Sequence, residues 1–234
     1  MSTATFEVPG LPLPVAVRRM ANARRLRLRI DHDRQLLRLT VPARGSARAA
    51  LRWVGEQRAW IEQQLALAPG ATPFADGATV PFRGDPLTIR WQEADRRGAR
   101  QVGSELHVGG PRPSLARSVQ RWLLAAAREE LSAETGRIAA AAAVSVRSVS
   151  VGDAASRWGS CSAAGAIRYS WRLILAPPPV LRFVVAHEVA HRLHMDHSPA
   201  FKAAEERLFG GPTAEARRLL RELGPALRRV GRGS

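Results

Sequence analysis

The sequence predicts an α+β protein in two parts: a β-rich subdomain with one helix over residues 1–110, and a domain with a small sheet and long helices over residues 111–234. Two observations predict this division. In the first part, short runs alternate apolar and polar side chains with the two-residue period of a strand. The second part opens, after a Gly-Gly-Pro break, with a long segment rich in Ala, Leu, Arg and Glu. With 234 residues, 45% of them hydrophobic, the chain can bury a core.

The first part begins with two strands that can pair, followed by a helix. Residues 24–30 place leucine and isoleucine on one face and arginine on the other, which is typical of a half-buried strand. Residues 36–41 form a second β-type run that can pair with the first across a short turn. From residue 46 to residue 68 the apolar period becomes helical, with Ser46 as N-cap, and a Pro-Gly pair then ends the helix.

Further elements follow the same patterns. Residues 114–142 have the composition of a long helix, interrupted near Gly136. Three prolines at 177–179 introduce another helix, because proline is favoured in the first turn. β-type runs are expected around residues 87–91, 105–108, 144–151 and 166–175.

The charge balance is strongly basic. Thirty-six basic and 20 acidic residues give a formal net charge of +16, and Lys202 is the only lysine. Such a chain can bind nucleic acid or another polyanion by releasing counterions. The arginines are spread along the chain rather than clustered, so we favour a biased amino-acid composition over a dedicated nucleic-acid site and expect only weak polyanion binding.

The sequence also bears on the compartment. No run of eighteen apolar residues occurs, so we expect no membrane span, and the first residues lack the basic-then-apolar pattern of a signal peptide. Cys161 is the only cysteine and cannot form an internal disulfide. A reducing, cytoplasmic location is therefore expected.

The helix after the three prolines contains the motif H-E-x-x-H, formed by His187, Glu188 and His191. Residues four apart share a helix face, so both imidazoles can reach one metal ion, and two nitrogen ligands with an open position suit Zn²⁺. Glu188 lies beside that face and can take a proton from the water that such an ion activates. A structural histidine pair is the alternative, but two histidines and a glutamate on an apolar helix are costly without a metal.

Two residues compete to be the third ligand. His194 continues the same helix face but lies about 10 Å along the axis from His187, too far for both to bind one ion from a straight helix. His197 precedes Ser198-Pro199, which can begin a new helix as N-cap and first residue. A chain that turns there can return His197 to the metal, so we favour His197.

Acidic residues near the motif could orient the ligands. Asp196 could hold an imidazole, although a turn-forming aspartate is the simpler interpretation. Glu205 or Glu206, one or two turns into the next helix, could do the same.

The order of these motifs resembles the YgjP-like metallopeptidases, relatives of the SprT and WLM zinc proteases. The resemblance is carried by the R-W-G-S-C-S block at 157–162, by Ile167 and the W-R-L triplet at 171–173, and by H-E-x-x-H-x₅-H-S-x-x-F at 187–201. It extends loosely over nearly the whole chain except about the last 25 residues. The chain departs from the usual pattern at Ser170, where the family has Asn, and at Lys202, where it has Trp.

The resemblance implies a zincin-like catalytic domain that hydrolyses peptide bonds in a protein or peptide. His187, His191 and His197 would hold Zn²⁺, and Glu188 would activate the water and later protonate the leaving amine. In zincins an edge strand beside the metal helix binds an extended substrate, and residues 166–173 are expected to do so here.

The R-W-G-S-C block leaves several roles open. Gly159-Ser160 favours a tight turn, with Trp158 buried. Arg157 either contacts the substrate or a developing oxyanion, or it tethers the turn. Cys161 is interpreted as a small buried residue. Tyr169, outside the block and the only tyrosine, is interpreted as a packed aromatic rather than an oxyanion donor.

Two other functions are compatible with the sequence. A metal-dependent nucleotide phosphohydrolase would keep the metal and attract its substrate through the arginines. A non-enzymatic polyanion-binding protein would instead have a structural zinc site, closed by a fourth ligand such as Cys161 or His194. The sequence does not indicate the oligomeric state.

Overall fold

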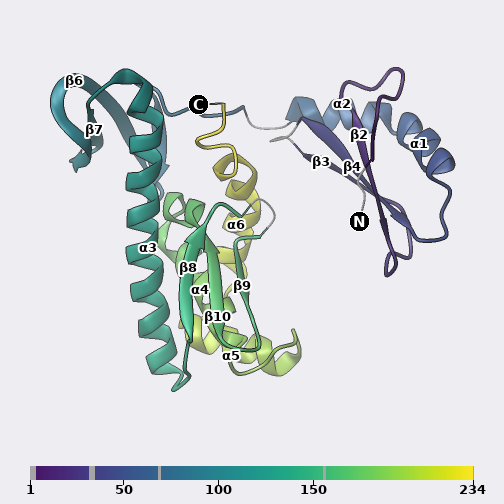
Figure 1. Cartoon of the computed structure of the whole chain (residues 1–234). Helices are drawn as coiled ribbons and strands as arrows, with labels where there is room; N and C mark the ends of the chain where they lie inside the picture. Colours follow the sequence, from purple (N-terminus) through teal and green to yellow (C-terminus); the bar gives the residue numbers. More distant parts are fainter. Residues whose placement is uncertain (1–3, 32–34, 68–69, 155–156, 234) are drawn as a thin grey trace. The chain divides into compact units, whose positions relative to one another are not determined.

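The computed structural model describes residues 4–31, 35–67, 70–154 and 157–233 (Figure 1). Contacts divide the chain into two compact units, residues 1–68 and 69–234, so the division falls earlier than the 110/111 boundary expected from the sequence. The physical reason is that the strands within residues 79–109 bury their apolar side chains in the core of the second unit, against its long helix.

The first unit contains a four-stranded sheet with strand order β1-β2-β4-β3 and two helices. The central strands β2 and β4 are parallel, whereas β1 and β3 pair antiparallel with their neighbours. Its buried core joins the sheet to both helices through Val15, Val17, Leu37, Leu39, Val41, Ala50, Val54 and Ile61. The elements are β1 (Ala4–Phe6), β2 (Val15–Met20), β3 (Arg27–Asp31), β4 (Leu36–Pro42), α1 (Ala47–Glu56) and α2 (Arg58–Leu67).

The expected pairing of two alternating strands is confirmed, since β3 and β4 form an antiparallel pair. Ser46 caps α1, and its hydroxyl accepts a hydrogen bond of 3.2 Å from the amide of Ala49. The prediction of a single helix over residues 46–68 is wrong, because two helices meet at Gln57. The break follows Gly55, a residue type with low helix propensity.

The second unit begins with a three-stranded sheet of order β5-β6-β7, made of β5 (Thr79–Phe82), β6 (Asp85–Val102) and β7 (Glu105–Gly109). β6 is much longer than the strand expected around 87–91. Residues 88–92 of β6 pair in parallel with β7. After a shift in register, residues 97–102 of β6 pair with β7 again, and Val102 lies opposite Glu105. The connection between Val102 and Glu105 contains Gly103, which has a φ of 59°.

The remainder of the second unit carries the motifs. α3 is continuous over 27 residues, so the interruption expected near Gly136 is absent. A second sheet of order β8-β10-β9 has β8 parallel and β9 antiparallel to the central strand. The elements are η1 (Arg112–Ser114), α3 (Leu115–Ala141), β8 (Ser148–Gly152), β9 (Gly159–Cys161), β10 (Ala166–Ser170), η2 (Trp171–Leu175), α4 (Pro178–Ala190), α5 (Pro199–Phe209) and α6 (Ala214–Leu227).

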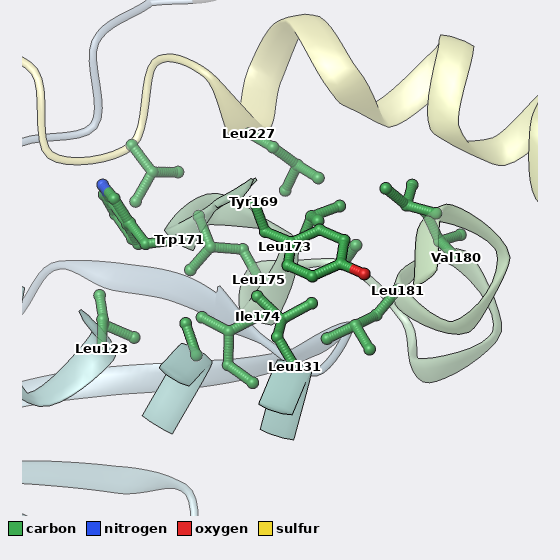
Figure 2. Close-up of a cluster of buried hydrophobic side chains, with 14 of the residues drawn as sticks. Leu123, Leu131, Tyr169, Trp171, Leu173, Ile174, Leu175, Val180, Leu181 and Leu227 are labelled. Carbon is green, nitrogen blue, oxygen red and sulfur yellow. The ribbon is translucent and has the colours of Figure 1, made fainter. Parts of the chain in front are cut away.

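The core of this unit fixes α4 in place (Figure 2). The strand expected over 166–175 ends at Ser170, whose hydroxyl accepts from the amide of Arg172 and begins the 3₁₀ segment η2. η2 packs against α3 and α4. The labelled core residues are Leu123, Leu131, Tyr169, Trp171, Leu173, Ile174, Leu175, Val180, Leu181 and Leu227, all at most 4% exposed.

The α+β class expected from the sequence is confirmed by this mixture of small sheets and helices. Within the described residues, every helix is too short or too polar to cross a bilayer.

Candidate metal centre

The two histidines of the H-E-x-x-H motif lie at the end of α4. The helix begins with Pro178 and Pro179 in its first turn, as the sequence predicts, and most of its remaining residues are buried. His187 occupies the last turn, and His191 is the C-cap residue. Since residues four apart share a face, the rings lie together, with centroids 5.0 Å apart.

His197 returns to these two histidines after the helix ends. Ser198 caps α5, its hydroxyl accepting a hydrogen bond of 3.3 Å from the amide of Phe201, and Pro199 is the first helical residue, as expected. The Nε2 atoms of His197 and His187 are 3.4 Å apart. Nitrogen atoms of His187, His191 and His197 all lie within 4.8 Å of one another, and buried Phe201 packs against all three rings at centroid distances of 4.6–5.1 Å.

Hydrogen bonds at Nδ1 orient two of the imidazoles. Nδ1 of His187 lies 2.7 Å from Oε1 of Glu205, a carboxylate that is 1% exposed and that also accepts from Arg217 at 2.6 Å. Nδ1 of His191 lies 3.2 Å from the carbonyl oxygen of His194. When each Nδ1 carries the proton and donates it to these acceptors, both Nε2 atoms keep a lone pair for a metal.

Electrostatics favour these protonation states. Burial alone would raise the pKa of Glu205, but the hydrogen bond from His187 and the charge of Arg217 lower it overall, so the carboxylate is ionised at neutral pH. Burial lowers the pKa of His191, which keeps this imidazole neutral, as a metal ligand must be.

The donor set fits a zinc ion. Nitrogen ligands at about 2.0–2.1 Å in tetrahedral geometry are about 3.3 Å apart. The 3.4 Å between His187 and His197 agrees with that value. Within the described part of the chain the cluster consists of three histidines only; neither Cys161 nor His194 joins it. Three protein ligands with an open position are typical of a catalytic site rather than a closed structural site.

Glu188 is the buried carboxylate beside the cluster, with 5% of its surface exposed. Burial raises its pKa to about 7, although the charges of His187 and Arg157 lower it. A carboxylate that titrates near neutral pH can both accept and release a proton under ordinary conditions.

Gly159, the first residue of β9, lies directly against Glu188. A Cβ atom at position 159 would be 2.5 Å from Oε1, 2.7 Å from Cγ and 2.8 Å from Cδ of Glu188. No larger residue fits there without displacing the carboxylate. The tight turn expected at Gly159-Ser160 is absent, because both residues are strand residues paired with Tyr169 and Arg168 of β10, and no sequence pattern indicates the contact with Glu188.

The strand at the edge of the sheet beside α4 is also different from the one expected. Residues 166–173 were expected to form it, but β10 is the central strand and is paired on both sides. β9 has β10 as its single partner among the described strands. The edge strand beside α4 is therefore the Gly159–Cys161 segment of the R-W-G-S-C block.

The remaining residues of the block have separate positions. Arg157 is exposed, and the described residues include no hydrogen-bond partner for it. Trp158 is partly buried under the guanidinium of Arg228, which lies 4.2 Å from its ring centroid. Burial raises the pKa of the Cys161 thiol, and Sγ lies 3.4 Å from the carbonyl oxygen of Ser162.

Of the other candidate residues, Glu205 belongs to the site, whereas Tyr169, Asp196 and Glu206 have separate positions. Tyr169 is fully buried, and its hydroxyl is 3.1 Å from that of Thr135, as expected for a packed aromatic. Asp196 accepts from the amide of Ser198 at 3.2 Å and thus forms a turn. Of the two glutamates considered, Glu205 contacts His187, whereas Glu206 is exposed.

Comparison with known proteins adds one finding. The sequence model of a family described as YgjP-like, metallopeptidase domain, matches residues 24–223, which is most of the chain and covers a large part of each unit. No curated protein and no solved structure matches the chain.

Proposed function

The chain belongs to the YgjP-like metallopeptidase family, and on this premise we propose that it is a zinc-dependent peptidase acting on protein or peptide substrates in the cytoplasm. The observation that carries the proposal is the convergence of three imidazoles beside a buried carboxylate whose pKa is raised to about 7 by burial. A metal ion and a proton acceptor beside it are parts that metal-assisted hydrolysis needs.

The ligands in this proposal are His187, His191 and His197. A zinc ion bound there would supply Lewis-acid polarisation of the scissile carbonyl and would make water acidic enough to attack near pH 7. Glu205 holds His187 through Nδ1 and, with the support of Arg217, keeps its ring in the orientation that directs Nε2 to the centre of the cluster.

Glu188 is the general base and acid. Its carboxylate takes the proton of the attacking water and then donates it to the departing amine, so one group serves both steps. Burial supports this role, because in the metal-free chain it raises the pKa of Glu188 above the usual range of a carboxyl group, to about 7.

β9 is the proposed binding strand for an extended substrate. Its outer edge has no partner among the described strands, and its first residue contacts Glu188. A peptide pairing with this edge would satisfy its backbone groups and would pass beside the carboxylate. Residues 159–161 thus replace residues 166–173 as the substrate strand.

A second candidate is a metal-dependent nucleotide phosphohydrolase. The observation that favours it is Arg157, an exposed guanidinium whose charge acts on Glu188 and which could contact a phosphate near the metal. The non-enzymatic alternative requires a closed site, and the three-histidine cluster argues against it.

One preparation can separate these functions. The zinc-loaded chain is incubated with a mixture of unstructured peptides and, separately, with nucleoside triphosphates, and Glu188→Gln is assayed in parallel. We expect the native chain to cleave peptides and the Glu188→Gln variant to have lost this activity. Release of phosphate or pyrophosphate that is lost in the same variant, without peptide cleavage, would favour the second candidate and contradict the first.

A further inference from the structure

Arginines of three adjacent strands meet on one face of the sheet in the first unit. In β3, Arg27 and Arg29 alternate with partly buried apolar residues. Arg29 lies opposite Arg38 of β4, while Arg27 and Arg18 of β2 lie on either side of Thr40. Neighbouring strands are about 5 Å apart and alternate residues along a strand about 7 Å, so these arginines form two short rows.

This face is the one that the helices leave uncovered. Leu37 and Leu39 point to the opposite face, where they form the core with residues of α1 and α2. The four arginines alternate along their strands with Leu37 and Leu39 or with the residues that pair with these two, so they lie on the face of the sheet opposite the leucines. All four are exposed.

In the described strands of this unit, arginines outnumber acidic residues. Asp31 is the only acidic residue in the described strands of this unit, and it pairs with Arg38 at 2.6 Å. Arg29 and Arg38 lie directly opposite each other, an unfavourable arrangement of like charges on a sheet that Asp31 offsets only in part. A bound polyanion would remove that cost.

We propose that this arginine face, defined by Arg18, Arg27, Arg29 and Arg38, binds the phosphate backbone of a nucleic acid without regard to its sequence. Guanidinium groups match phosphate oxygens bidentately, and a regular array of like charges complements a backbone that repeats at regular intervals. None of the strand residues on this face is aromatic, so base stacking is not expected and binding depends on charge.

The test measures binding of the full chain to a short fluorescent DNA duplex by anisotropy. Salt is varied from about 50 mM to about 200 mM. The variant Arg27→Gln/Arg29→Gln removes two charges from the face. Its matched control, Arg48→Gln/Arg52→Gln, removes two exposed charges from α1. We expect the first variant to bind about tenfold or more weakly at low salt, with a salt slope reduced by about 2, and the control to bind nearly as the native chain does.

The variant Arg27→Lys/Arg29→Lys distinguishes a loss of charge from local unfolding as the cause of weaker binding. Because it keeps both positive charges, it should keep the native salt slope. Equal losses in the glutamine variant and its control, or no binding at low salt, would overturn the proposal. Competition by polyglutamate as effective as that by DNA of equal charge would also overturn it, in favour of an acidic protein. The zinc-loaded Glu188→Gln chain should bind DNA normally, so this result is independent of the peptidase proposal.

Discussion

Gly159→Ala tests the contact between β9 and Glu188. The structure leaves no space for the added methyl group, which would lie 2.5 Å from the nearest carboxylate oxygen and 2.7 Å from Cγ of Glu188. Non-bonded carbon atoms prefer separations of about 3.5–4.0 Å, so the strand or the carboxylate must move by about 1 Å.

The expected effect is on catalysis rather than on metal binding. A displacement of about 1 Å in a catalytic group can cost on the order of 100-fold in rate. We therefore expect kcat for peptide cleavage to fall by about that factor in Gly159→Ala. Zinc content should stay at the native value, because the close contacts of Gly159 are with Glu188 rather than with a histidine.

The assay combines steady-state kinetics, zinc analysis and thermal unfolding of the same samples. The matched control is Gly136→Ala, at an exposed position of α3 with no neighbouring atom within 4 Å of the new methyl group. This substitution should leave kcat unchanged and stabilise the helix by about 0.5–1 kcal/mol. If Gly159 acts through Glu188, the double variant Gly159→Ala/Glu188→Gln should be no slower than Glu188→Gln alone. Native kcat in folded, zinc-loaded Gly159→Ala would refute the reasoning.

Three further outcomes follow from the metal centre. His197→Ala should lose zinc while His194→Ala retains it, as measured by metal analysis after dialysis; the reverse pattern would identify His194 as the ligand. Glu205→Gln removes the charge that holds His187 and should weaken zinc affinity by about 10–100-fold in competition with a chelator, and native affinity would exclude this role. In the metal-free chain, the folded-state pKa of Glu188 is raised to about 7, so its contribution to stability is present below about pH 4.5 and is lost as the pH rises through 7. Glu188→Gln should accordingly raise the melting temperature of the metal-free chain more at pH 8 than at pH 5, and an equal effect at both would contradict the raised pKa.

Features determined by local geometry could be predicted from the sequence. His187 and His191 are four residues apart on a helix, so their convergence follows from the helical period. The return of His197 could be anticipated because Ser198-Pro199 carries the chemistry of a helix start, and the structure has that cap. The antiparallel pair of β3 and β4 likewise follows from the alternation of apolar residues and arginine.

Features that depend on distant contacts could not be predicted. The apolar residues of β5 and β7 would be buried equally well in the core of either unit. Their sequence pattern therefore does not indicate to which unit these strands belong. The contact of Glu205 with His187 joins two helices, and the neighbouring Glu206 was an equal candidate. Gly159 has no side chain, so its role depends on the order of strands in the sheet, which no local pattern specifies.

The most direct test of the proposed mechanism is the turnover of zinc-loaded Glu188→Gln. Glutamine keeps the size of the side chain, but its amide oxygen is too weakly basic to take a proton from water, while the three histidines remain. The variant should bind zinc and substrate as the native chain does, whereas peptide hydrolysis should fall by about 10²–10⁴-fold, the usual contribution of a general base. Turnover at the native rate on a peptide that the native chain cleaves would contradict the mechanism.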